Sequence, residues 1–521
     1  MLKFSKLTHS KVSKNKPVLI LVLFIGFFSS ITYWIGYNSN SNIEKSNINQ
    51  WQNVNFILNH LIGNYVDSID KNELAKKSIS NILKDLDPHS TYIPSEKREA
   101  VNETLVGHFG GVGIRFMILR DTLTVVDVID GGPSSEIGLK KRDRIIKIDG
   151  ENITKIGISN ELVLKKLKGP FGTNVNIDIL NTNKEIENKN ITRGLIPLKS
   201  IVACEKIEDG IGYVKISTFS NNTDLELKDA LLSLNLKKIK GLILDLRFNG
   251  GGYLHQAINV ADEFLPKNKL IVYTKGAHSK KQTYYAKKNG LYEKGKLIIL
   301  VNSGTASASE IVSGAIQDHK RGIIIGRRTF GKGLVQQPVL LPDSSELRIT
   351  TSRYYTPSGK CIQKPYGDSI DYENDIFERL QNGELTEQDT IGKSLSKKGG
   401  IWPDIFSPID TLNYNEIVSR ITFSRNWRDF CFDYFDKNPN KPYDKLFDFY
   451  KSFKIDKTFV IDYFEKNKLN LDDLNNKIMV DLNRSFMLEV GNYYYGDQAR
   501  YILSAYEDID VKKAIRQIKK Y

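Results

Sequence analysis

Three short and almost entirely apolar runs constrain the fold of this chain more than any other feature. They read GLILDL at 241–246, LIILVN at 297–302 and GIIIG at 322–326. Strands without polar alternation are typical of sheets that are covered on both faces. A helical stripe of apolar residues over 254–265 lies between the first two runs. Strand and helix in alternation predict parallel strands with right-handed crossovers, hence an α/β domain.

A second region, from Gly107 to about Asn181, has a different sequence pattern, which is typical of short strands and turns. We expect strands at 110–119, 122–129, 144–150 and 175–180 and a short helix at 160–168. Val175, Ile177 and Ile179 alternate with polar residues, as in a half-buried strand. These signals predict a small, mostly β domain.

The order of these pieces, with GGVGIRF at 110–116 and GGPSSEIGLKKRDRIIKIDG at 131–150, resembles a PDZ domain of the type found in processing proteases. Glycines in such a loop let consecutive N–H groups converge on an anion, and the next strand offers its edge to an extended peptide. The resemblance implies that a peptide C-terminus binds at Gly111, Val112, Gly113 and Ile114. A small β domain that only packs is the alternative.

The N-terminus carries a membrane signal. Five lysines and no acid occupy residues 1–16, and residues 17–37 carry no charge. At a rise of about 1.5 Å per residue, this segment suffices to cross a bilayer. The positive flank stays in the cytoplasm. We expect a basic cytoplasmic tail at 1–16, a single-pass inner-membrane anchor at 17–37 and a periplasmic or otherwise extracytoplasmic remainder. A cleaved signal peptide is the alternative, although no clear A-x-A site is present.

Composition excludes several classes of function. The chain has 75 Lys and Arg against 61 Asp and Glu, a net charge of +14, but the basic residues are scattered and form no block interleaved with aromatics. We therefore expect no nucleic-acid partner. Cys204, Cys361 and Cys431 lie far apart and form no CxxC pair. We expect neither a metal site nor a cofactor.

A cluster of hydroxyls, VNSGTASASEIVSG at 301–314, marks the step from an apolar strand to a helix. A helix N-terminus offers unpaired N–H donors and partial positive charge, which is a potential oxyanion hole beside a reactive hydroxyl. Helix capping is the alternative, because Ser and Thr are favoured caps. Around a helix Ser307 and Ser309 differ by about 200°, whereas Ser307 and Glu310 share a face.

A serine nucleophile needs a base. A triad would draw on His255, His278 or His319, with Asp245 as the carboxylate. His319 lies about 18 Å from the helix start, and the neighbours of His255 include no orienting acid. The triad stays open but is weak.

Lys332, in RRTFGKGLVQQ at 327–337, is the better candidate base. Burial among apolar neighbours and nearby cations lower a lysine pKa, and Arg327 and Arg328 contribute if they point inward. We expect Gln336, four residues after Lys332, to hold the amine by a neutral hydrogen bond.

The strand at 241–246 ends in DLRFNGGG at 245–252, whose glycines can bring N–H groups beside a nucleophile. The rival function, phosphate cradling, lacks both GxGxxG and GxxxxGK[ST]. We therefore favour an oxyanion loop.

Five motifs together resemble the C-terminal processing peptidases, or tail-specific proteases, of serine peptidase family S41. They are LDPHSTYIP (86–94), DLRFNGGG (245–252), GTASASEIVSGAIQDH (304–319), TFGKGLVQ (329–336) and YYTPSGKCIQ (354–363), so the resemblance covers about residues 50–370. It implies that Ser307 is the nucleophile and that Lys332 is the general base, with Gln336 as its orienting partner. It also implies an oxyanion hole formed by Ala308 with Gly250 or Gly251, and Glu310 as an accessory residue.

We therefore expect a multidomain chain with five parts after the basic tail: the anchor, an N-terminal helical region at 45–97, a PDZ-like domain at 98–190, an S41-type α/β core at 191–370 and a mainly helical extension at 371–521. Within the helical region, Val66 to Lys71 separate two helices. The extension shows no catalytic constellation, so we expect a cap, packing surface or dimerisation element.

The expected function is a membrane-anchored serine endopeptidase that uses a Ser-Lys dyad and an acyl-enzyme, with protein substrates that have free, apolar C-termini. A non-catalytic envelope adaptor for C-terminal peptides and an esterase or amidase are the alternatives. Whether the chain forms a homo-oligomer stays open.

Overall fold

The computed structural model describes residues 50, 52–367, 372, 374–386, 399–409 and 415–520. The chain divides into two compact units, Met1–Ile82 and Leu83–Tyr521. The expected basic tail at 1–16 and anchor at 17–37 lie outside the described residues. Within the described part, no helix combines the length and apolar character needed to span a bilayer.

The first unit is helical. A helix over 52–64 and α2 (Lys71–Lys84) are separated by a break, as the sequence predicts. The Asp70 carboxylate accepts the N–H of Asn72 at 2.8 Å and so caps the start of α2. Several apolar side chains of the first helix are exposed, including Val54, Phe56 and Ile57.

The PDZ-like domain is built on an antiparallel sheet in the order β3-β4-β5-β7-β8, with β6 beside β5. The strands are β3 (Ile114–Leu119), β4 (Thr122–Val128), β5 (Arg144–Ile148), β6 (Glu151–Asn152), β7 (Asn174–Leu180) and β8 (Ile186–Thr192), with helices α4 (Pro133–Glu136) and α5 (Asn160–Leu167). Val175, Ile177 and Ile179 are buried while the residues between them are not, which confirms the predicted alternation.

Two elements connect this domain to the rest of the second unit. Helix α3 (Ser95–Val106) precedes it, and a two-stranded ribbon of β2 (His108–Gly111) and β9 (Gly194–Pro197) joins its two ends. The amine of Lys168 lies over the ring of Phe109, a residue of β2 in this ribbon.

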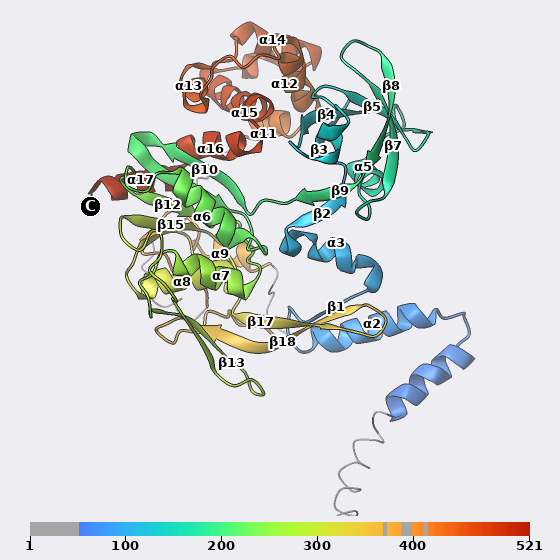
Figure 1. The fold of residues 1–521 in the computed structure, drawn as a ribbon, viewed down its shortest axis with the longest axis vertical. Helices are drawn as coiled ribbons and strands as arrows, with labels where there is room; N and C mark the ends of the chain where they lie inside the picture. Colours follow the sequence, from blue (N-terminus) through green and yellow to red (C-terminus); the bar gives the residue numbers. More distant parts are fainter. Residues whose placement is uncertain are drawn as a thin grey trace, which may run out of the picture. The chain divides into compact units, whose positions relative to one another are not determined.

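The core of the second unit is a six-stranded sheet in the order β10-β11-β12-β15-β16-β19. Figure 1 labels three of its strands, β10, β12 and β15. Its strands are β10 (Ile201–Ile207), β11 (Ile211–Ile216), β12 (Leu242–Asp245), β15 (Leu297–Val301), β16 (Ile323–Gly326) and β19 (Ile405–Phe406). From β11 to β19 every pairing is parallel, which confirms the α/β prediction from the three apolar runs.

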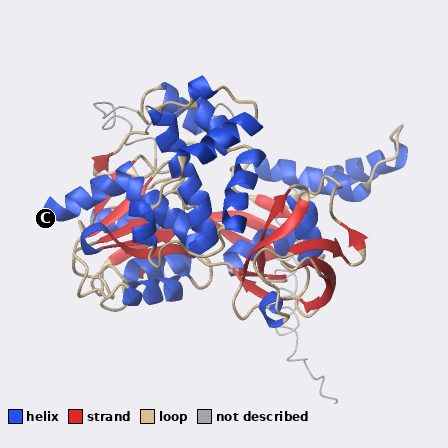
Figure 2. Ribbon diagram, turned by 90° about the horizontal axis from the view of Figure 1, so that it is seen from above, coloured by secondary structure: helices blue, strands red, loops and turns tan. Residues whose placement is uncertain are grey.

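Helices cover both faces of this sheet (Figure 2). On one face lie α6 (Thr223–Ser233), α7 (Leu254–Asp262) and α8 (Ala308–Asp318); on the other lie α16 (Asp497–Glu507) and α17 (Ile509–Lys520). Along β15, Leu297, Ile299 and Val301 join one hydrophobic core, while Ile298 and Leu300 join the other. Both faces being buried explains the continuous apolar run.

A second, antiparallel sheet was not predicted from the sequence. It has the order β1-β18-β13-β14, with β17 paired to β18. The strands are β1 (Thr91–Ile93), β13 (Leu270–Lys275), β14 (Gln282–Tyr285), β17 (Leu334–Leu340) and β18 (Glu346–Tyr355). β1 comes from the expected helical region, and β19 of the core sheet comes from beyond residue 370. Strands of two or three residues are too short to show a period.

The C-terminal extension is mainly helical, as expected. It contains α9 (Asp375–Gln381), α11 (Glu416–Thr422), α12 (Arg425–Lys437), α13 (Leu446–Ser452), α14 (Lys457–Lys466) and α15 (Asn476–Tyr495), followed by α16 and α17. Its aromatic-rich core shares one cluster with Leu119 of the PDZ-like domain and with Ile298 of the central sheet. The extension therefore packs against both domains.

Candidate active site

Ser307 occupies the turn between β15 and α8. Its backbone has φ 56° and ψ −115°, a conformation that non-glycine residues adopt at a cost and that clusters at active sites. The Ser307 N–H donates to Glu310 Oε2 at 2.8 Å. The side chain lines a cleft that also receives Lys332 and Gln336.

Three other hydroxyls of the cluster form hydrogen bonds to backbone carbonyls. Thr305 donates to the Leu246 carbonyl at 2.9 Å, Ser309 to the Asn249 carbonyl at 3.0 Å and Ser313 to the Ser309 carbonyl at 2.8 Å. All three side chains are buried. Ser307 is thus separated from Ser309 as the helix phase predicts.

The glycine loop lies directly against the Ser307 turn. A Cβ at Gly251, whose φ is 104°, would lie 2.8 Å from Ser307 Cβ and 3.0 Å from the Ala308 nitrogen, so only glycine fits there. The Gly251 N–H already donates to Asn249 Oδ1 at 2.9 Å. Among the described residues, no acceptor takes the N–H of Gly250 or of Ala308. Of the two expected glycines, only Gly250 therefore has an N–H without an acceptor among the described residues.

Lys332 follows β16 on the turn into β17 and is half-buried. Burial and the positive charge of Arg348 lower the pKa of its amine, against the opposing charges of Glu310 and Asp87. Ser307 and Lys332 line the same cleft, but their side chains share no hydrogen bond in this part of the structure.

The cation that acts on Lys332 is not one of the two that the sequence suggested. Arg327 pairs with Asp510 at 3.0 Å and Arg328 with Glu384 at 2.7 Å. Arg348 lies instead on β18, which pairs with β17. No local pattern pointed to it, because the contact depends on a sheet that was not predicted.

The Glu310 side chain links the turn that carries Ser307 to the turn that carries Lys332. Its Oε2 accepts the N–H of Ser307 at 2.8 Å and of Lys332 at 2.9 Å, and its Oε1 accepts the Gly331 N–H at 2.8 Å. Oε1 also accepts the Thr329 hydroxyl. Burial raises the pKa of this carboxyl to about 7, although the hydrogen bonds favour the charged form. Glu310 therefore positions both turns.

Gln336 lines the cleft but is not bonded to Lys332. Its Nε2 donates to Thr350 Oγ1 at 3.1 Å, and the Thr350 hydroxyl donates to Asp87 Oδ1 at 3.0 Å. The structure thus connects Gln336 to the LDPHSTYIP segment. The expected partnership with the amine is not present.

Tyr354 and His89 are further neighbours of Lys332. The Tyr354 hydroxyl, on β18, donates to the Lys332 carbonyl, and burial together with the charge of Glu310 raises the pKa of this phenol well above its usual value. Burial and the charge of Lys332 lower the pKa of His89 to about 4, and its Nε2 lies 2.8 Å from the Tyr372 hydroxyl. His89 is therefore neutral near pH 7.

The three histidines considered for a triad lie elsewhere. His255, His278 and His319 do not line the cleft. His319 Nε2 lies 2.7 Å from the Leu270 carbonyl, and the His255 ring stacks on Tyr253. Across the described residues, no group of three or more His, Cys, Asp or Glu side chains is arranged to hold a metal.

The expected peptide-binding loop lies between β2 and β3. Gly111 ends β2, Ile114 begins β3, and Gly113 has φ 79°. The Val112 carbonyl accepts the Ser134 hydroxyl at 2.6 Å, which fixes the loop. Among the described strands, β3 pairs only with β4, so its other edge is not paired with a strand, as β-augmentation by a peptide requires.

Comparison with known proteins agrees with both halves of this arrangement. Residues 210–373 match the model of peptidase family S41, and residues 110–190 match the PDZ domain model. A carboxy-terminal-processing protease of Bartonella bacilliformis is 35% identical over 343 residues, which cover 65% of this chain and 78% of that protein. The carboxy-terminal processing protease CtpA of Bacillus subtilis is 32% identical over 340 residues, covering 64% and 72%.

Among solved structures, the photosystem II D1 C-terminal processing protease is 26% identical, with a TM-score of 0.38 and coverage of 68% of this chain and 87% of that one. The sequence relationship to the two processing proteases carries the assignment. The chain therefore belongs to peptidase family S41, as a PDZ-containing serine peptidase of the carboxy-terminal processing type.

Proposed function

We propose that this protein is a membrane-anchored endopeptidase that uses a Ser307–Lys332 dyad and an acyl-enzyme. One observation carries the proposal. The strained Ser307 turn, flanked by the free N–H groups of Gly250 and Ala308, shares a cleft with a lysine whose pKa is lowered by burial and by Arg348. These are a nucleophile, an oxyanion hole and a base.

The reaction would proceed in two halves. Neutral Lys332 takes the proton of Ser307 as Oγ bonds to the scissile carbonyl carbon, and the resulting oxyanion accepts the N–H groups of Gly250 and Ala308. Lys332 then gives the proton to the departing amine as the C–N bond breaks, which leaves an ester on Ser307. Lys332 next activates a water that hydrolyses this ester and restores the hydroxyl.

The substrates we propose are proteins with free, apolar C-termini. Their last residues would pair with the open edge of β3, and their carboxylate would lie at the loop of Gly111, Val112, Gly113 and Ile114. His108 and Phe109, on β2 just before this loop, line the same cleft as Ser307. The loop proposed to bind the carboxylate thus directly follows the strand that borders the cleft.

The proposed location is the periplasmic or extracytoplasmic side of the inner membrane, with residues 17–37 as a single-pass anchor. The basic residues 1–16 and the uncharged segment that follows support it. Self-association is a further part of the proposal, because the helix over 52–64 exposes Val54, Phe56, Ile57 and Leu61.

Two variants test the mechanism. Ser307→Ala and Lys332→Ala should each abolish cleavage of a protein with an apolar tail while Tm and binding of a C-terminal peptide stay near wild type. Mass spectrometry of wild-type enzyme quenched during turnover should show an adduct on Ser307. If the wild-type protein binds the peptide and cleaves nothing, the adaptor alternative is favoured. Cleavage by either folded variant contradicts the dyad.

A further inference from the structure

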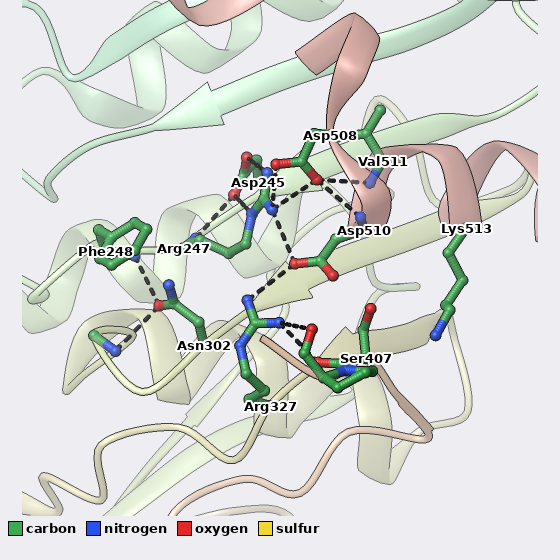
Figure 3. A network of polar contacts seen from close by, with 12 residues as sticks. Asp245, Arg247, Phe248, Asn302, Arg327, Ser407, Asp508, Asp510, Val511 and Lys513 are labelled. Carbon is green, nitrogen blue, oxygen red and sulfur yellow. Dashed lines mark hydrogen bonds and ion pairs between the residues drawn. The ribbon is translucent and has the colours of Figure 1, made fainter. Parts of the chain in front are cut away.

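The C-terminal extension reaches the back of the active site through one buried carboxylate. Asp510, at the start of α17, is 1% exposed. Its Oδ2 accepts Arg247 Nη1 at 2.9 Å and Arg327 Nη2 at 3.0 Å (Figure 3). A single oxygen therefore joins guanidinium groups from two separate loops of the core.

These two loops carry the two halves of the catalytic site. Arg247 lies three residues before Gly250 in the glycine loop, and Arg327 lies five residues before Lys332. Phe248, next to Arg247, donates its N–H to Asn302 Oδ1 at 3.0 Å, and Arg327 donates to the Ser407 carbonyl at 2.7 Å. Few residues thus separate either arginine from the proposed oxyanion donor or from the proposed base.

Asp508 strengthens the same junction. Both of its carboxylate oxygens lie 2.9 Å from Arg247 Nη1, and Oδ1 also accepts the N–H groups of Asp510 and Val511 at 2.9 and 3.0 Å. Asp508 thus caps α17 while it contacts the arginine. Asp245, buried at the end of β12, holds the rest of the guanidinium through Nε at 3.0 Å and Nη2 at 2.8 Å.

We infer that Asp510 is a positioning residue of the peptidase reaction. The extension completes the active site because it fixes the glycine loop and the turn that carries Lys332 in position relative to each other. The inference rests on the proposed Ser307–Lys332 mechanism. Asp510 contacts no reacting atom, and its effect passes through Arg247 and Arg327. Small displacements of catalytic groups cost large factors in rate, so its loss should lower kcat rather than substrate binding.

The test compares three Asp→Asn variants in the full-length protein. Asp510→Asn removes the charge from the shared oxygen. Asp508→Asn weakens the contact to Arg247 but keeps a good helix cap. Asp462→Asn is the matched control, because Asp462 lies in the same extension and pairs only with the exposed Lys466 in this part of the chain. The substrate is a short peptide ester, chosen because it has no tail for the PDZ-like domain to bind.

We expect Asp510→Asn to lower kcat at least tenfold and to slow acylation of Ser307 by a fluorophosphonate probe by a similar factor, with KM within twofold of wild type. Asp508→Asn should lower kcat threefold or more, and Asp462→Asn should match wild type. Rates are divided by the folded fraction, so a purely structural role would leave them unchanged. If Asp510→Asn does not fold, Asp508→Asn decides.

Wild-type kcat in folded Asp510→Asn, or in Asp508→Asn where the first variant does not fold, overturns the inference. Ser307→Ala in the same assay separates the two claims. If that variant is inactive and Asp510→Asn is fully active, only the positioning role fails. If Ser307→Ala still turns over the ester, the proposed nucleophile fails and the positioning role fails with it.

Discussion

A lysine acts as a base only in its neutral form, and at residue scale the surroundings of Lys332 decide how much of that form exists. An ordinary lysine, with a pKa near 10.4, is almost entirely charged at pH 7. Here burial and Arg348 lower the pKa, while Glu310 and Asp87 oppose them. In the proposed mechanism, Arg348 therefore affects the activity through the pKa of Lys332 and does not need to touch the substrate.

Arg348→Gln should shift the pH dependence of kcat/KM. Removing the positive charge raises the pKa of Lys332, so the neutral fraction falls at any pH below that pKa. The acid limb of kcat/KM should move to higher pH, with lower activity near neutrality and recovery in alkaline buffer. A pH profile with a short peptide ester measures it.

Arg353→Gln is the matched control for that profile. Arg353 lies on the same strand and donates to the Tyr366 hydroxyl at 3.2 Å, but it is not among the groups that shift Lys332. Its profile should coincide with wild type. An acid limb that stays in place in Arg348→Gln would contradict Lys332 as the base.

How far the sequence predicts the site depends on the range of each contact. Helix phase separated Ser307 from Ser309, and the neighbours of Lys332 within 327–337 made it the candidate base, because both are local properties. The engagement of Gln336 with Thr350 and the charge of Arg348 require the pairing of β17 with β18, which no local pattern specified. Asp510 lies 263 residues from Arg247, so its contact exists only in the folded chain.

At element scale, helix α17 shows how the central sheet acquires its second cover. Val511, Ala514, Ile515 and Ile518 are buried in the core between this helix and the sheet. A Cβ at Gly241 would lie 2.6 Å from Ile518 Cγ2, so the helix approaches the chain closely before β12. The Lys296 amine donates to the Ile518 carbonyl at 2.8 Å and fixes the C-terminal end.

Ile518→Ala should destabilise the protein by about 2–5 kcal/mol, because it removes a fully packed side chain and leaves a cavity. Ile509→Ala, in the same helix but 45% exposed, should change stability by no more than about 0.5 kcal/mol. Urea unfolding of both variants measures the difference. Equal effects would mean that α17 does not pack as described.

The same scale explains which elements the sequence predicts. Strands β12, β15 and β16 were predicted because burial on both faces leaves a run of apolar residues. β1 has three residues and β19 has two. They are strands only because they pair with β18 and β16, respectively. Their hydrogen-bond partners are distant in sequence, so propensity alone cannot locate them.

At the scale of the whole molecule, the extension also fixes the PDZ-like domain. Arg115 pairs with Asp497, Arg120 with Asp433, and Arg142 with Asp436. Each arginine belongs to the PDZ-like domain and each aspartate to the extension. Exposed pairs contribute little singly, at about 0–1 kcal/mol, but several at one interface add to the apolar contact around Leu119.

Reversing two of these charges should loosen the domain. In Asp433→Lys combined with Asp436→Lys, attraction to Arg120 and Arg142 becomes repulsion. We expect a larger radius of gyration in small-angle scattering and a change of at least threefold in kcat/KM for a protein with an apolar tail. The short ester, which has no tail for the PDZ-like domain to bind, should be cleaved at the wild-type rate.

A compensating variant tests whether the effect of the reversal depends on charge. Adding Arg120→Asp and Arg142→Asp restores opposite signs across the interface, so the radius of gyration should return towards wild type, and tail-dependent turnover should follow it if the loop still binds peptide. Recovery is expected to weaken in high salt, because these pairs are partly exposed and therefore screened. If reversal changes the turnover of ester and tailed protein equally, the ion pairs act on the catalytic core and not on the delivery of the substrate tail.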